Sequence, residues 1–282
     1  MAKQVMARSL STVIRKLLRF AKGKRSSDLV YPPDQTGSGC RHQAIPPIVY
    51  HTAESRGIHP QHAKSLEEFR VQNRELSFVL FDGAARDSYM QEHWSNHPIY
   101  DVYRRALFGQ MRADIFRYCI VFERGGYYFD YNKGCSVPLT SLHEPDAEGL
   151  ITAESNYVTL FPHADAATHL SHPFNLYAQW GFGFRPEHPL LETAINRIVE
   201  IEPHFRDEVF PVPKEGVLTL TATGLFTDAV RTYVSEYGAQ DLTQTGTDFN
   251  GHGIFRLRGS KIALRSASHY SKQRSQLIIQ AP

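Results

Sequence analysis

The chain has 282 residues, of which 41% are hydrophobic and 21% are charged, an ordinary composition for a globular protein. This length suits one large domain or two small ones, and no apolar run approaches the roughly 20 residues that a membrane-spanning helix needs. The formal net charge is +2, but eight of the 31 basic residues precede Asp28, where the sequence has no acid. The rest of the chain is therefore acidic on balance, which excludes a general nucleic-acid-binding surface and assigns the positive charge to an N-terminal arm.

Residues 1–25 are predicted to form a basic amphipathic helix, because apolar residues recur every three or four positions opposite arginines and lysines. Such a helix commonly lies on an anionic membrane surface. Packing on its own domain or on a second subunit is the main alternative, and a transit peptide or nucleic-acid binding are less favoured. Residues 26–42 are predicted to be a linker, because they are rich in serine, proline and glycine.

The three cysteines are Cys40, Cys119 and Cys135, an odd number at no metal-ligand spacing. They are typical of reduced thiols in a cytosolic protein rather than of a disulfide framework.

Residues 43–282 are expected to fold as a single α/β domain, since strand and helix patterns alternate along them. This alternation favours a doubly wound sheet with right-handed crossovers. Strands are predicted at 45–52, 76–82, 127–129, 149–154, 157–161, 180–184 and 261–265. Helices are predicted at 63–73, 86–94, 190–201 and after Gly224, with a long one that begins at Ile99 and ends at the glycine pair 125–126.

The stretch 111–137 is the most informative part of the sequence. Asp114 and Arg117 are three residues apart, so they share one face of a helix. Glycines 125–126 end that helix, and a short aromatic strand follows. Asp130 and Asn132 then point to the same side of the chain. Acids at the carboxyl end of a buried strand mark the place where open α/β folds bind ligands.

These residues form a motif that resembles the core of the DXD-containing sugar transferases of the GT-A fold. The resemblance is closest to glycosyltransferase family 32, the family of Golgi-type α-mannosyltransferases and bacterial capsule and lipopolysaccharide transferases. The matching positions are Arg112, Asp114, Arg117, Tyr118, Gly125, Gly126, Tyr128 and Asp130. The sequence departs from the family at Asn132, where relatives have a second acid.

The resemblance implies a Rossmann-like mixed sheet, mostly parallel and flanked by helices. It also implies an enzyme that transfers a hexose from a nucleotide-sugar donor to a glycan or glycolipid acceptor, with retention of the α configuration. The expected setting is surface-polysaccharide synthesis on the cytoplasmic face of a membrane, with no nucleic-acid partner. The alternatives are a protein-glycosylating effector-type transferase and a nucleotide-sugar-binding protein without turnover.

By the same resemblance, Asp114, Arg117 and Asp130 are the expected catalytic residues. The expected donor-binding residues are Tyr50, His51, Arg112, Asp114, Arg117, Gly126, Tyr128, Asp130, Thr223 and Gly224. Simpler explanations remain open for three parts of this set. Asp114 and Arg117 also fit a surface helix pair, Thr223 fits a helix N-cap, and His51 fits a buried histidine satisfied by the protein.

A divalent cation such as Mn²⁺ or Mg²⁺ is the expected cofactor, because the leaving diphosphate must be neutralised. The resemblance places its ligands at Asp130, Asn132 and His269. The amide of Asn132 carries no charge, so metal affinity is expected to be weak. The alternative is that cationic side chains take over the role of the metal, and Lys133 lies next to this position.

Overall fold

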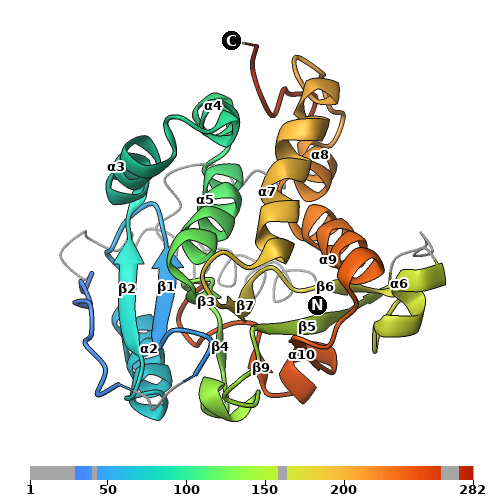
Figure 1. The fold of residues 1–282 in the computed structure, drawn as a ribbon. Coiled ribbons are helices and arrows are strands. Elements are labelled where there is room, and N and C mark those ends of the chain that lie inside the picture. Colours follow the sequence, from blue (N-terminus) through green and yellow to red (C-terminus); the bar gives the residue numbers. More distant parts are fainter. Residues whose placement is uncertain (1–28, 40–42, 158–163, 262–272, 282) are drawn as a thin grey trace, which may run out of the picture.

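The computed structural model describes residues 29–39, 43–157, 164–261 and 273–281 (Figure 1). The helix expected at 1–25 lies outside these residues, as do His269 and positions 262–265 of the expected last strand. Within the described ranges, none of the helices combines the length and the apolar character that crossing a membrane requires.

A seven-stranded sheet forms the centre of the molecule, in the order β2-β1-β3-β7-β5-β6, with β8 also paired to β5. Strand β1 is parallel to β2 and to β3, whereas β7 runs antiparallel between β3 and β5. Strands β1, β2, β3, β5 and β8 therefore point the same way, which confirms the mixed, mostly parallel sheet. The strands are β1 (Ile48–Thr52), β2 (Ser77–Phe81), β3 (Gly126–Phe129), β5 (Gly149–Tyr157), β6 (Asn175–Tyr177), β7 (Gly181–Phe184) and β8 (Leu242–Thr245).

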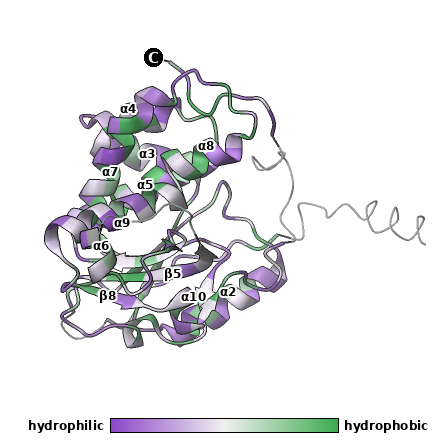
Figure 2. Cartoon of the chain, turned by 90° about the vertical axis from the view of Figure 1, so that its right-hand side faces the viewer, coloured by the Kyte–Doolittle hydropathy of each residue, from purple (hydrophilic) through white to green (hydrophobic). Residues whose placement is uncertain are grey.

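Helices cover both faces of this sheet (Figures 1 and 2). One face carries α3 (Gly83–Trp94), α4 (Pro98–Arg105), α5 (Gly109–Arg124), α7 (Pro189–Ile201), α8 (Pro213–Leu220) and α9 (Thr223–Tyr237). The other face carries α2 (Pro60–Gln72) and α10 (Thr247–Asn250), and α6 (Ala164–His169) lies beside β6. A two-stranded ribbon of β4 (Gly134–Cys135) and β9 (Gly253–Ile254) completes the fold.

The strands divide the core into two apolar layers, because successive side chains on a strand point to opposite faces. Tyr50 and Tyr128 belong to the layer under α5, α7 and α9. Val49 and Tyr127, their neighbours in sequence, belong to the layer on the side of α2. The short apolar strands of the sequence are thus buried on both faces, as the pattern predicts.

The prediction of one long helix from Ile99 to the glycine pair is wrong. Ala106 is extended, with φ −61° and ψ 127°, and this break separates α4 from α5. The backbone of the break instead pairs with the C-terminal segment: the N–H of Leu107 donates to the carbonyl oxygen of Ile278 at 2.9 Å. The periodicity of a helix could not reveal this, because the competing partner lies some 170 residues later in the chain. Likewise, the two strands expected at 149–154 and 157–161 join in one strand, β5, as far as residue 157.

Glycines 125 and 126 make the turn that joins α5 to β3, and both have positive φ angles, of 64° and 106°. A Cβ atom on Gly126 would lie 2.7 Å from Cγ2 of Ile48. This close approach lets β3 begin beside β1 directly after the helix. The carboxyl end of β3 is thereby placed next to the end of β1.

We expect Gly126→Ala to lower the free energy of unfolding by about 2–4 kcal/mol, because it adds a steric overlap with β1 to the cost of a positive φ angle. Gly251 is a matched control, with a φ of 81° and no atom within 4 Å of the place that a Cβ would take. Gly251→Ala should cost only about 1 kcal/mol, the cost of the backbone angle alone. Urea denaturation followed by circular dichroism measures both; equal losses would contradict the packing argument.

Candidate active site

A cavity of about 1190 Å³ opens at the edge of the sheet where β1 and β3 end. Thr52 closes β1, Asp130 follows β3 and Glu154 lies near the end of β5, and all three residues line the cavity. These strands point the same way, so their carboxyl ends meet at one edge, the usual ligand-binding place in open α/β sheets. Helix α5 contributes Asp114 and Arg117 to the same wall.

The guanidinium group of Arg117 joins the two acids of the motif. Its Nη2 atom lies 2.9 Å from Oδ1 of Asp114 and 3.2 Å from Oδ1 of Asp130. Its Nη1 donates to the carbonyl oxygen of Gln179 at 2.9 Å, and its central carbon lies 4.5 Å from the centre of the Tyr128 ring. The planar, multi-donor shape of a guanidinium group suits such bridging. Asp114 and Arg117 are both buried, so they are not an exposed helix pair.

Asp114 shares one cation with a second carboxylate. Its Oδ2 accepts a hydrogen bond from Oγ1 of Thr221 at 3.0 Å. Burial raises the pKa of Asp114 to about 7, and the charge of Asp130 adds to this effect, whereas Arg117 opposes it. The Asp114 carboxyl group therefore exchanges a proton near neutral pH, and it can either accept or donate a hydrogen bond at the cavity wall.

Asp130 is the more accessible of the two acids, with 30% of its side chain exposed. Its Oδ1 accepts from Arg117 and from the hydroxyl group of Tyr128 at 3.1 Å. Its Oδ2 has no protein partner in the described part of the chain. One carboxylate oxygen is thus held in place while the other faces the cavity, free for a ligand.

The turn after β3 carries Asn132 and Lys133. Asn132 is exposed, and its side chain has no hydrogen-bond partner within the described residues. Lys133 is buried, and burial lowers its pKa to about 8 although the charges of Asp130 and Glu154 oppose the shift. Its Nζ atom lies 3.0 Å from the centre of the Phe255 ring.

Six of the predicted site residues meet on the cavity wall: Asp114, Arg117, Tyr128, Asp130, Asn132 and Thr223. Thr223 is the first residue of α9, and the N-cap position belongs to Ala222, so Thr223 is not the N-cap of this helix. Arg112 lies off the cavity wall and donates to the carbonyl oxygen of Ala106, which closes the break between α4 and α5. His269 lies outside the described residues.

Tyr50, His51, Gly126 and Gly224 also lie off the cavity wall. Tyr50 is 3% exposed and packs in the core. His51 is fully buried, its Nδ1 lies 2.7 Å from the carbonyl oxygen of Phe129, and burial lowers its pKa to about 4. A Cβ atom on Gly224 would lie 2.7 Å from the carbonyl oxygen of Leu218, so this glycine lets α8 and α9 pack closely.

The cavity also contains residues that the sequence did not single out as part of the site. Thr221, which holds Asp114 in place, is two residues before the predicted Thr223, and Glu154 is the last residue of the strand expected at 149–154, although β5 continues to Tyr157. Both residues could therefore have been predicted as site residues from the sequence. Phe255 and Arg256 follow the two-residue strand β9 and could not have been predicted, because only the pairing of β9 with β4 brings them to the site.

A second cluster of acids and histidine lies at the amino-terminal ends of β5 and β8. Ligand atoms of Glu148, His188 and Asp241 lie within 4.8 Å of one another, a spacing that suits a metal ion. However, Nδ1 of His188 accepts a hydrogen bond from the N–H of Leu190, so the ring carries its proton on Nε2, 3.2 Å from Oδ2 of Asp241. A protonated nitrogen cannot bind a metal, and burial lowers the pKa of His188 to about 4, so this cluster is better explained as a polar contact between a neutral imidazole and Asp241 at the start of α7.

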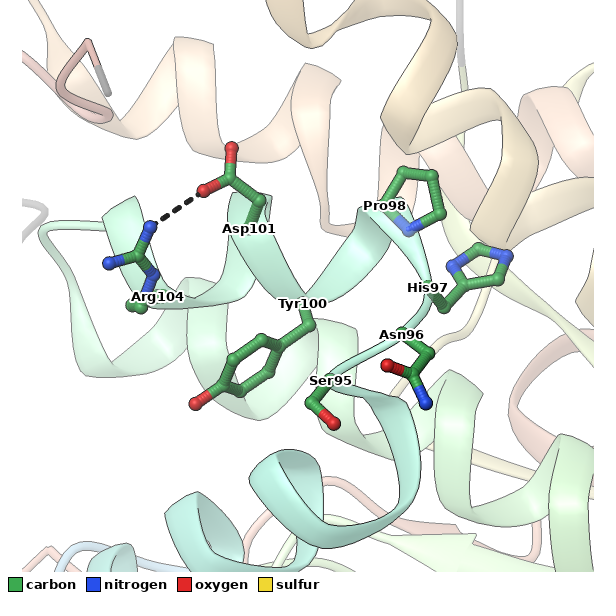
Figure 3. A pocket seen from close by; sticks show the side chains of 7 residues that line it. All are labelled: Ser95, Asn96, His97, Pro98, Tyr100, Asp101 and Arg104. Atoms are coloured by element: carbon green, nitrogen blue, oxygen red, sulfur yellow. Dashed lines mark hydrogen bonds and ion pairs between the residues drawn. The ribbon is translucent and has the colours of Figure 1, made fainter.

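A smaller pocket of about 510 Å³ lies at the turn between α3 and α4 and shares no lining residue with the cavity (Figure 3). The ion pair between Asp101 and Arg104, at 2.9 Å, lies beside it on α4. The other lining residues are Ser95, Asn96, His97, Pro98 and Tyr100. His97 caps the start of α4, since its Nδ1 accepts a hydrogen bond from the N–H of Ile99, and the pocket lies apart from the candidate site.

Residues 60–148 match the family model described as a glycosyltransferase sugar-binding region containing a DXD motif. The match supports a glycosyltransferase. It spans the stretch that holds Asp114, Arg117 and Asp130, and together with the mixed sheet flanked by helices it agrees with the predicted GT-A fold class. The finer family assignment and any mannosyltransferase specificity are not part of this result.

A solved structure titled "PaToxG Glycosyltransferase" is similar over 84% of this chain and 80% of that chain, with a TM-score of 0.48 and 12% sequence identity. A likeness this distant carries no information about donor or acceptor. None of the curated proteins matches the sequence significantly.

We predict that Asp114 makes the stability of the protein fall as pH rises from about 4 to about 7. Its pKa is raised in the folded state from an ordinary 3.8 to about 7, so in this window the folded protein holds a proton that the unfolded chain has lost. Raising the pH therefore favours unfolding. Asp114→Asn removes this titration. Urea denaturation at pH 4, 5.5 and 7 should show that wild type loses stability relative to the variant; a constant difference would contradict the raised pKa.

Proposed function

We propose that the chain transfers a hexose from a nucleotide-sugar donor to a glycan or glycolipid acceptor, with retention of the anomeric configuration. The observation that carries this proposal is the bridge from Asp114 through Arg117 to Asp130 on the wall of the cavity, inside the region that matches the sugar-binding family model. The cavity volume of about 1190 Å³ is ample for a nucleotide sugar.

The polar groups of the bridge suit a sugar ring that carries several hydroxyl groups. Asp114 exchanges a proton near neutral pH, so it can accept a hydrogen bond from one hydroxyl or donate one to another. Arg117 is held by five neighbouring groups, which include the carbonyl oxygen of Ala113, so it keeps Asp114 and Asp130 at a fixed spacing. Such a fixed arrangement would hold a bound sugar in one orientation relative to the acceptor hydroxyl group, as glycosyl transfer requires.

The residues of the turn after β3 fit a divalent cation. The free Oδ2 of Asp130 and the exposed amide of Asn132 are both oxygen donors, the type that Mg²⁺ and Mn²⁺ prefer. When bound, the cation would supply positive charge to the donor diphosphate. A single carboxylate makes this a weak protein site, so the phosphate oxygens of the donor would complete it. His269 remains a proposed third ligand.

The proposed setting is peripheral, on the cytoplasmic face of a membrane, with residues 1–25 on an anionic surface and surface-polysaccharide synthesis as the process. Its support is the basic amphipathic pattern of those residues. A nucleotide-sugar-binding protein without turnover is the second candidate, because Asn132 replaces an acid that the resemblance leads us to expect. Hydrolysis or transfer of a bound donor distinguishes the two.

We predict that one or more nucleotide sugars raise the melting temperature of the wild-type protein in the presence of Mn²⁺. At a donor concentration of 100 times Kd, linkage contributes about 2.7 kcal/mol of stability. Asp130→Ala should abolish the shift, because it removes the accessible carboxylate of the site. Asp146→Ala, which changes an exposed acid outside the cavity, is the matched control. A panel of uridine, guanosine, cytidine and adenosine diphosphate sugars covers the unknown base; a shift that survives in Asp130→Ala would overturn the assignment.

We predict that Asn132→Asp strengthens Mn²⁺ binding about tenfold or more, because it replaces a neutral ligand with a charged one. Electron paramagnetic resonance of free Mn²⁺ measures the change directly. Asn96→Asp adds the same charge at an exposed position of the small pocket and should leave Mn²⁺ binding unchanged. An equal response of the two variants would show that Asn132 is not a metal ligand. Full donor turnover in EDTA would argue against any metal role.

A further inference from the structure

Four basic residues line the cavity: Arg117, Lys133, Lys214 and Arg256. The charge of Arg117 is already compensated by its ion pairs with Asp114 and Asp130. The other three make no ion pair within the described part of the chain. The acids on the cavity wall repel an anionic ligand. An anion is therefore favoured only near the three basic side chains that have no ion-pair partner.

Lys133 differs from Lys214 and Arg256 because its side chain is buried, with only 7% of its surface exposed, whereas the other two are exposed. Its position is fixed at both ends. At the backbone, its N–H donates to the carbonyl oxygen of Asp130 at 2.8 Å. At the side-chain end, Nζ lies 3.0 Å from the centre of the Phe255 ring and 5.4 Å from that of Trp180.

The aromatic contacts restrain the ammonium group without using its hydrogen-bond donors. An ammonium group has three N–H donors, and a ring face attracts the charge but offers no conventional acceptor oxygen. Burial removes part of the hydration of the Lys133 ammonium group, and an anion bound at this place would restore the lost interaction. A phosphate group supplies both the charge and the oxygens.

We propose that Lys133 is a diphosphate-binding residue, whose ammonium group contacts the donor diphosphate beside Asp130 from a position set by Phe255 and Trp180. This inference rests on the proposed function and goes beyond it, because it assigns the charge at the leaving group to a side chain as well as to a metal. Lys133 directly follows Asn132, the position at which the resemblance leads us to expect an acid. The positive charge of Lys133 is therefore adjacent in sequence to a position that has lost a negative charge.

The step that Lys133 would assist is the departure of the nucleoside diphosphate. The bond between the anomeric carbon and the phosphate oxygen breaks, and its electron pair leaves with that oxygen. The acceptor hydroxyl oxygen forms the new bond to the anomeric carbon, and its proton passes to the departing phosphate. Lys133 keeps its own protons and stabilises the negative charge that develops on the leaving oxygen.

The test compares Lys133→Met with wild type in binding nucleoside diphosphates by isothermal titration calorimetry. The probes are UDP, GDP, CDP and ADP, each with its matching nucleoside, in Mn²⁺ and again in EDTA. We expect Lys133→Met to weaken binding of the preferred diphosphate about tenfold or more, while binding of the nucleoside stays the same. Lys133→Arg should retain most of the affinity, because it keeps the charge. Lys64→Met removes an exposed lysine of α2 outside the cavity and should change nothing.

Two results would overturn the inference in distinguishable ways. If wild type and Lys133→Met bind the diphosphate equally, Lys133 is not a ligand, and the proposed function stands. If wild type binds none of the four diphosphates in either buffer, the proposed function fails, and the role of Lys133 fails with it. Should Lys133→Met not fold, Phe255→Leu provides the second test, since Phe255 is 57% exposed and its loss frees the ammonium group without removing it. We expect about threefold weaker diphosphate binding, and unchanged binding would overturn the inference.

Discussion

The buried guanidinium group of Arg117 holds together the parts of the molecule that make the site. It contacts Asp114 one turn earlier on α5 and Asp130 beyond the end of β3, and so ties the helical layer to the edge of the sheet. The charges of Arg117 and Asp114 are buried, whereas Asp130 is 30% exposed, and a buried charge that loses its partner is costly, so neither of the two buried residues is easily replaced alone. Arg117 is one cation shared by two acids. Burial raises the pKa of Asp114, so this acid can hold a proton and the excess negative charge is reduced.

The chain path that allows this contact depends on the glycine pair between α5 and β3. Positive φ angles at Gly125 and Gly126 turn the chain from α5 directly into β3. The lack of a side chain at Gly126 lets β3 lie against β1. A longer connection would move Asp130 away from Arg117, because each added residue extends the chain by up to roughly 3.5 Å. The fixed spacing of the motif in the sequence is therefore the spacing that this geometry requires.

This dependence explains how much the sequence could predict. The acids and the arginine lie within 17 residues, in a helix, a turn and a strand whose local preferences agree, and the structure brings them together. The strand and helix order was also readable, because apolar runs and turn residues alternate clearly. The break at Ala106 and the placement of Phe255 could not be predicted from the sequence. Each results from a pairing with a distant segment, the C-terminus in one case and β4 in the other, and no local pattern encodes it.

The adjacent residues Asn132 and Lys133 change the electrostatics of the site in the same direction. Compared with an acid at the first position, Asn132 removes one negative charge beside Asp130, and Lys133 adds a positive charge on the same wall. A less negative wall attracts a free metal cation less strongly and a diphosphate more strongly. On the proposed function, metal and donor would favour each other's binding, because the phosphate oxygens would supply the charge that the protein does not provide. On the same proposal, a donor already complexed with its cation would suit this wall better than either partner alone, and selectivity for the complex would accompany weaker affinity for the free metal.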